Sequence, residues 1–204
     1  MRNRKGLLIV LSGPSGSGKG TVLKELLAKN NNLFLSVSAT TRSPREGEVH
    51  GKHYYFLSKD EFEARIADDG MLEYASYCGN YYGTPKDAVY EMLNAGKDVI
   101  LEIEVQGAMQ IKERCPDAVF VFVMPPSMNE LKHRLTDRRT EDAETVAKRM
   151  QAAVDEIRAS YQYDYIVVND TVSEAANTLD EIIRVQKCST GHMKEFIDEV
   201  LEDE

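Results

Sequence analysis

The sequence has few cysteines and no long apolar run. Three cysteines occur in 204 residues, at Cys78, Cys115 and Cys188. They lie far apart without the spacing of metal ligands, and their odd number does not suggest a disulfide framework. No stretch approaches the roughly 20 apolar residues that a membrane-spanning helix needs. We therefore expect a cytoplasmic protein in a reducing compartment.

Positive charge is also scarce. The chain carries 25 Lys and Arg against 34 Asp and Glu, which gives a net charge of −9. This balance disfavours a general nucleic-acid binder or a protein attracted to anionic membranes. An anionic ligand would have to be met by a local concentration of positive charge. The cysteines and the four histidines do not form a convincing nucleophilic centre.

What the sequence does have is a phosphate-binding loop within residues 7–21, LLIVLSGPSGSGKGT. Five apolar residues predict a buried strand, and the glycine-rich segment after it leads into a predicted helix. Gly13, Gly18 and Lys19 fit the pattern G-x-x-x-x-G-K, in which backbone N–H groups surround phosphates and the lysine reaches the far end of the phosphate chain. The helix adds its positive N-terminal end to the same point.

The rest of the chain predicts an α/β fold in one folding unit, without a linker or repeat. Apolar runs predict further strands at residues 33–37, 54–56, 71–77, 98–105, 119–124 and 165–168, with a tight loop at 79–85. Helices are predicted at residues 21–29, 58–67, 128–135, 151–160 and 171–187. Because a helix separates the first two strands, we expect a parallel sheet flanked by helices.

Arg42 and Arg45 lie three residues apart in a polar loop. Two arginines so close repel one another unless an anion joins them, and their planar guanidinium groups suit a phosphate. The alternative is a solvated loop with two ordinary surface arginines. The spacing alone does not decide between them.

Glu102 and Glu104 lie two residues apart in the strand predicted at 98–105, and hence on one face of it. Paired acids at the end of a parallel strand beside a phosphate loop are suited to holding hydrated Mg²⁺. The loop itself has Gly20 where the pattern asks for Ser or Thr, so the Thr21 hydroxyl comes one position late. The sequence therefore leaves open whether that hydroxyl binds Mg²⁺ directly or through water.

A second group of arginines lies at the end of the helix predicted at 128–135 and beyond it, and could collect negative charge: Arg134, Arg138, Arg139 and Arg149. The alternative is a salt-bridged helix pair, because acidic residues stand between and beside these arginines: Glu130, Glu141, Asp142 and Glu144.

Seven residues stand at fixed spacings behind the GPSGSGKGT loop: Thr41, Arg42, Arg45, Glu48, Gly51, Tyr54 and Phe56. At these spacings they closely resemble the signature of guanylate kinases, and from residue 7 to about residue 187 the blocks of that family appear in the expected order. The resemblance implies a P-loop kinase core made of residues 1–37, 95–129 and 151–204. It also implies a GMP-binding insertion at residues 38–94 and a lid at residues 130–150.

The resemblance also implies site residues. ATP would be bound by Gly13, Pro14, Ser15, Gly16, Ser17, Gly18, Lys19, Gly20, Thr21 and Asn169. GMP would be bound through its phosphate by Arg42, Arg45, Tyr54 and Tyr82 and through guanine by Ser38, Glu73 and Thr84, with Glu48 and Glu102 in the same set. The catalytic residues would be Lys19, Arg134, Arg138 and Arg149, and Thr21 and Glu104 would approach Mg²⁺ through water. Arg139 departs from the family's usual glycine.

The role given to Glu73 agrees with the chemistry of guanine. Guanine offers N1–H and an exocyclic amine as adjacent donors, which a carboxylate accepts together. Adenine reverses the pattern at positions 1 and 6, so Glu73 would face an acceptor. A buried group left unpaired typically costs about 1–3 kcal/mol, and more when it is charged.

The expected activity is transfer of a phosphoryl group from ATP, with Mg²⁺, to GMP and also dGMP, within purine nucleotide metabolism and GMP recycling. Two alternatives stay open. One is a related monophosphate or small-metabolite kinase, since the GKGT ending also suits adenylate-type kinases. The other is a guanylate-kinase-like binding module that recognises phosphorylated partners without catalysis, although such modules usually have a degraded phosphate loop.

The tail at residues 193–204 lies beyond the resemblance. Its apolar residues are Phe196, Ile197, Val200 and Leu201, and they could dock on the core or on another subunit. The sequence therefore leaves open whether the protein is a monomer or a homo-oligomer.

Overall fold

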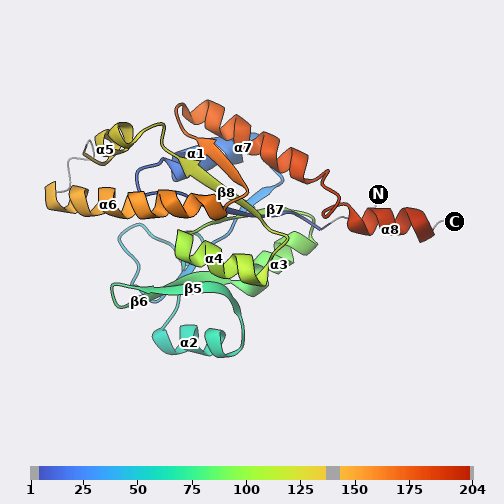
Figure 1. The fold of residues 1–204 in the computed structure, drawn as a ribbon. Coiled ribbons are helices and arrows are strands. Elements are labelled where there is room, and N and C mark those ends of the chain that lie inside the picture. The colour runs from blue at the N-terminus through green and yellow to red at the C-terminus, as the bar shows by residue number, and fades with distance from the viewer. Residues whose placement is uncertain (1–4, 137–142, 203–204) are drawn as a thin grey trace. The chain divides into compact units, whose positions relative to one another are not determined.

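The structure is a computed structural model that describes residues 5–136 and 143–202 (Figure 1). The chain forms two compact units. Unit 1 consists of Met1–Leu8 and Leu33–Ala118, and unit 2 consists of Ile9–Asn32 and Val119–Glu204. Each unit is therefore assembled from two separate stretches of the chain.

Unit 2 contains parallel strands with helices around them. Strand β8 (Val119–Met124) pairs in parallel with both β1 (Leu8–Ser12) and β9 (Tyr165–Val168). All five residues of β1 are buried, as expected for a parallel strand covered on both faces. The helices are α1 (Lys19–Lys29), α5 (Met128–Thr136), α6 (Ala143–Ala159), α7 (Val172–Gln186) and α8 (Lys194–Glu202), with a short 3₁₀ helix, η1 (Ser160–Gln162).

Helices α5 and α7 of unit 2 begin close to their predicted starts, each next to a capping side chain. Helix α7 buries Ala175, Leu179 and Ile183, spaced one turn apart, and packs against α1. The Thr171 side chain caps α7 by accepting from the Glu174 backbone N–H, which satisfies one free donor of the first turn. Ser127 accepts in the same way at the start of α5.

Unit 1 contains a parallel pair of strands and a separate mixed sheet. Strand β2 (Leu33–Leu35) pairs in parallel with β7 (Asp98–Glu102). The mixed sheet has the order β4-β3-β6-β5, made of β3 (Ala39–Thr40), β4 (Tyr55–Phe56), β5 (Met71–Tyr77) and β6 (Asn80–Pro85). The helices of unit 1 are α2 (Lys59–Ala67), α3 (Lys86–Asn94) and α4 (Val105–Arg114).

The predicted α/β class with parallel strands and flanking helices is confirmed. The strands predicted at residues 71–77, 119–124 and 165–168 have those bounds in the structure, and Ser58 forms the predicted capping box with Glu61. Helix α1 begins at Lys19, two residues before the predicted start. Among the described residues, no helix is long and apolar enough to cross a membrane.

Two predictions of local structure are wrong. Residues 79–85 were expected to form a tight loop, but β6 runs antiparallel to β5 from Asn80 onward. The turn is confined to Cys78 and Gly79, whose φ angles are 49° and 75°, as a two-residue hairpin requires. The strand predicted at residues 98–105 ends at Glu102, because α4 begins at Val105.

Candidate functional site

The phosphate loop joins β1 to α1 with the geometry that its glycines predict. Gly18 is the N-cap of α1 and has a φ of 89°, in the left-handed region that favours glycine. A Cβ at Gly18 would lie 2.3 Å from the Asn169 side-chain nitrogen. The loop therefore brings its backbone against Asn169 at a position where no side chain fits.

Lys19, the first residue of α1, lies over this loop. Its ammonium donates to the carbonyl oxygen of Gly13, and a longer contact of 3.4 Å joins it to the Pro14 oxygen. The lysine is thus held beside the backbone groups that the pattern assigns to phosphate binding.

Arg134 and Asn169 support the loop from α5 and from the end of β9. The side-chain amide nitrogen of Asn169 donates to the Ser17 backbone oxygen at 2.7 Å. Arg134 donates to the backbone oxygen of Asn169 at 3.0 Å and to that of Ser17 at 3.4 Å. Asn169 is 3 % exposed, and its Oδ1 atom has no hydrogen-bond partner among the described residues. The structure therefore gives Asn169 a contact with the loop, while its predicted contact with the donor nucleoside stays a prediction.

The predicted lid is described only in part. Arg134 forms an ion pair with Glu130, 2.8 Å away and one turn earlier on the same helix, which is not a bridge between two helices and does not decide between the two interpretations. Arg149 lies on α6. Arg138 and Arg139 lie outside the described residues.

The acceptor-phosphate candidates gather in unit 1 around Arg42. Its guanidinium donates two hydrogen bonds to Glu48, at 2.8 and 2.9 Å, a bidentate geometry that fixes the arginine plane. Glu48 also accepts from the Arg45 backbone N–H at 2.7 Å. These bonds lower the pKa of Glu48 to about 2, and the bond from the Arg42 side chain has the largest effect. The same bond raises the pKa of Arg42. Glu48 therefore fixes the orientation of the Arg42 guanidinium.

Two tyrosines complete this cluster. The Arg42 guanidinium lies 5.4 Å from the centre of the Tyr54 ring, within the range of a cation–π contact. The Tyr54 and Tyr82 rings meet edge to face with centres 6.3 Å apart. Burial raises the pKa of Tyr54, although Arg42 opposes the shift. Its phenol is therefore protonated at neutral pH and can donate to an anion.

The guanine-contact candidates Glu73 and Thr84 form one buried pair. They face each other across β5 and β6, and the Thr84 hydroxyl donates to Glu73 Oε1 at 2.7 Å. Glu73 is only 5 % exposed. Burial raises the pKa of this carboxyl, and the Thr84 hydrogen bond opposes the shift.

The predicted pairing of Glu102 and Glu104 on one strand face is wrong. Glu102 is the last residue of β7, whereas Glu104 is the N-cap of α4, so the period-two argument does not reach Glu104. Within residues 5–136 and 143–202 no group of three or more His, Cys, Asp and Glu could hold a metal ion. Glu104 and Thr21 are both exposed, and their oxygen atoms are of the kind that Mg²⁺ prefers, commonly through water.

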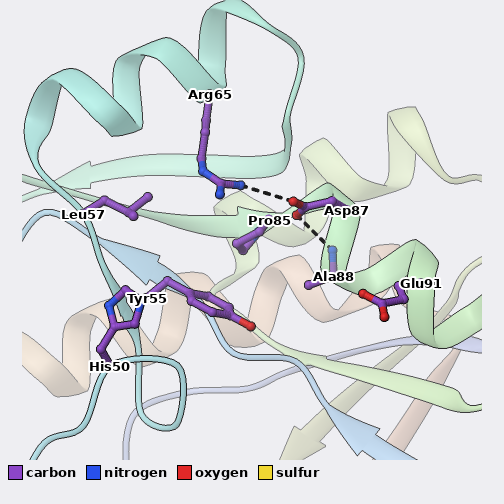
Figure 2. Close-up of a pocket in the computed structure, with 8 residues that line it drawn as sticks. All are labelled: His50, Tyr55, Leu57, Arg65, Pro85, Asp87, Ala88 and Glu91. Carbon is purple, nitrogen blue, oxygen red and sulfur yellow. Dashed lines mark hydrogen bonds and ion pairs between the residues drawn. The ribbon is translucent and has the colours of Figure 1, made fainter.

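A cavity of about 370 Å³ lies elsewhere in unit 1 (Figure 2). Its lining residues are His50, Tyr55, Leu57, Arg65, Pro85, Asp87, Ala88 and Glu91. Arg65 and Asp87 form an ion pair of 3.5 Å beside it. None of the predicted site residues is among the eight, so this cavity is separate from the predicted GMP contacts.

Comparisons with known proteins agree with the resemblance. A family model described as guanylate kinase matches residues 5–186. The chain is 55 % identical over 193 residues to a guanylate kinase of Clostridium tetani, covering 95 % of this chain and 92 % of that one. It is 54 % identical over 201 residues to one of Lactiplantibacillus plantarum, with 98 % of both chains covered. The crystal structure of guanylate kinase from Anaplasma phagocytophilum matches with a TM-score of 0.73 and 34 % identity, over 91 % of this chain and 88 % of that one.

Proposed function

The chain belongs to the guanylate kinase family, and on this premise we propose that it transfers the γ-phosphoryl group of ATP to GMP, giving ADP and GDP. The observation that carries the proposal is the buried pair of Glu73 and Thr84. A desolvated carboxylate beside a hydroxyl complements the adjacent donors and the nearby acceptor of guanine. An ordinary structural position would favour an apolar residue there, because burying a carboxylate is costly.

On the donor side, we assign the ATP phosphates to the loop at residues 13–21, through its backbone N–H groups at every position except Pro14, and to Lys19. Arg134 and Asn169 hold the loop in shape through the Ser17 oxygen. No general base is needed, because the attacking group is already a phosphate oxyanion. The chain's own contribution is positioning, neutralisation of charge and exclusion of water.

Mg²⁺ is the cofactor that this chemistry implies. Thr21 and Glu104 would hold it through water, and when bound it would neutralise charge on the donor phosphates. Lys19 supplies positive charge from the protein itself. The arginines assigned to the lid, Arg134, Arg138 and Arg149, are proposed to do the same.

On the acceptor side, we assign the GMP phosphate to Arg42, Arg45, Tyr54 and Tyr82, with Glu48 fixing the Arg42 plane. Ser38 is assigned to guanine and Glu102 to the acceptor nucleotide. The contacts assigned to Arg42, Arg45, Tyr54, Tyr82, Ser38, Glu73 and Thr84 go to the base or the phosphate, and none of them needs the ribose 2′-hydroxyl. We therefore propose that dGMP is also a substrate, and that the enzyme serves purine nucleotide metabolism and GMP recycling in the cytoplasm.

The test is release of ADP, measured by a coupled assay with Mg²⁺, ATP and each of GMP, dGMP, AMP, CMP and UMP. We expect rapid ADP release with GMP and dGMP and little with the others. Comparable turnover of AMP would favour an adenylate-type kinase. Binding of GMP without formation of GDP would favour the non-catalytic module.

Arg42→Lys should raise the KM for GMP by about tenfold or more and leave the KM for ATP within about twofold, because an ammonium cannot replace a bidentate guanidinium. Steady-state kinetics with each nucleotide varied in turn measures both constants. Arg158→Lys is the matched control, since Arg158 is exposed on α6 and pairs with Asp155 on the same helix. An equal rise in both constants would contradict the assignment of Arg42 to GMP.

A further inference from the structure

Helix α4 is attached to β5 along one of its faces. The Gln110 side chain accepts from the Tyr74 backbone N–H at 3.2 Å and donates to the Tyr74 oxygen at 2.9 Å. One turn later, Arg114 donates to the Met71 oxygen at 2.9 Å. Positions three or four apart lie on the same side of a helix, so these bonds join a single face of α4 to the strand that carries Glu73.

Gly107 lies on this face, one turn before Gln110, and the side chain of Glu73 occupies the space where its Cβ would be. A Cβ at Gly107 would lie 2.6 Å from Glu73 Oε2 and 3.1 Å from its carboxyl carbon. Gly107 is buried inside a helix, where glycine is less stable than alanine. The close approach of the carboxylate is the packing reason for glycine at this position.

The position of the Glu73 carboxylate therefore depends on two neighbours. Thr84 donates to Oε1, and Gly107 lacks the side-chain carbon that would collide with Oε2. Gln110 binds both backbone polar groups of the next residue, Tyr74. Both the carboxylate and the strand that carries it have a fixed position relative to α4.

We propose that Gly107 and Gln110 are positioning residues that set selectivity for guanine through Glu73. Gly107 leaves the space in which the carboxylate lies, and Gln110 fixes the backbone beside it. The inference rests on the proposed function, in which Glu73 accepts from guanine. The two adjacent donors of guanine lie in the plane of the base and require both carboxylate oxygens in that same plane, so a displaced carboxylate loses one of the two bonds.

Inosine monophosphate separates this role from a structural one, because it lacks the exocyclic amine and offers Glu73 a single donor. A shift of the carboxylate should therefore weaken the binding of GMP more than the binding of inosine monophosphate. The kinetic preference for GMP over inosine monophosphate thus reports the position of Glu73. A general loss of stability would instead lower kcat/KM for both nucleotides by the same factor.

The experiment measures kcat/KM for GMP and inosine monophosphate, and the KM for ATP, in Gly107→Ala and Gln110→Ala. We expect the KM for GMP to rise by about tenfold in Gly107→Ala and about threefold in Gln110→Ala, with the KM for ATP within about twofold. The preference for GMP over inosine monophosphate should fall in both. Gly191→Ala is the control for the glycine change, because a Cβ there meets nothing within 4 Å. Gln106→Ala, exposed on the same helix, is the control for the glutamine.

A double-mutant cycle tests whether Gly107 acts through Glu73. In a Glu73→Ala background the added methyl group meets no carboxylate, so Gly107→Ala should change the KM for GMP by less than about twofold. A change as large as in the wild-type background would overturn the inference.

The wild-type protein separates this test from that of the proposed function. If wild type forms no GDP, the proposed function fails and the inference fails with it. If wild type is active and the folded variants keep its preference for GMP over inosine monophosphate, the inference alone is overturned. A parallel rise of the KM for GMP and ATP overturns it as well. Should Gly107→Ala not fold, the result for Gln110→Ala decides.

Discussion

Lys19→Met is expected to lower kcat by about a thousandfold, the scale on which a single positioned donor to transition-state charge contributes. Methionine keeps the length and apolar body of the side chain but not its charge. The affinity for GMP should be nearly unchanged, because Lys19 belongs to the phosphate loop in unit 2 and the GMP contacts are assigned to unit 1. Steady-state turnover gives kcat, and calorimetric titration with GMP in the absence of ATP gives the affinity.

The matched control for Lys19 is Lys24→Met, an exposed lysine on the same helix, which should keep wild-type turnover. Lys19 also donates to the Gly13 and Pro14 oxygens, so the melting temperature of the variant has to be compared with that of wild type. Turnover that survives the substitution would refute the role of Lys19 in phosphoryl transfer.

Glu73→Gln is expected to raise the KM for GMP by about a hundredfold and to leave that for ATP within about twofold. A hydrogen bond to a charged group contributes about 1.5–3 kcal/mol, and glutamine replaces one carboxylate oxygen by a donor that faces the donors of guanine. Kinetics with each nucleotide varied in turn gives both constants. Glu91→Gln, an exposed carboxylate on α3, is the control, and equal losses for both nucleotides would count against the assignment.

The same carboxylate should make GMP use sensitive to pH. Burial raises the pKa of Glu73, and only the ionised form accepts from both donors of guanine. We therefore expect kcat/KM for GMP to fall on acidification at a higher pH than an exposed glutamate would give. This fall should be absent from the pH profile of Glu73→Gln.

The raised pKa of Glu73 affects folding stability in the opposite direction: acidification lowers the use of GMP but favours the folded state. A carboxyl whose folded pKa is raised stabilises the fold below its unfolded pKa, and that contribution is lost as the pH rises through the folded pKa. Once ionised, the buried Glu73 carboxylate is therefore a cost to folding. Above the pH at which Glu73 ionises, the melting temperature of Glu73→Gln should accordingly equal or exceed that of wild type. That result would show that a loss of GMP binding in this variant is not a loss of fold.

The strands that could be predicted were those in which apolar residues dominate. The run at 119–124, VFVFVM, has no competing interpretation, and the structure gives it those bounds. Strand β6 was missed because Gly83 and Pro85 are typical of turns. Their strand conformation depends on pairing with β5, which is tertiary and invisible to local propensity.

For the candidate site, the sequence could name candidate residues but not how they contact one another. The spacing of Arg42 and Glu48 marks both, yet only the structure shows Glu48 binding the guanidinium through two bonds. Gly107 carried a weak signal, a single glycine after an apolar strand. Gln110 carried none, because a glutamine on a helix is ordinary until its partner is known.

The way the two units divide the chain determines when the phosphate loop can form. Strand β1, which precedes the loop, pairs with β8 through Ile9 and Val119, and Asn169 supports the loop from still further along. A growing polypeptide that leaves the ribosome therefore carries the loop from the beginning without the partners that shape it. The capacity to bind a triphosphate must emerge late in biosynthesis, after most of the chain has been translated.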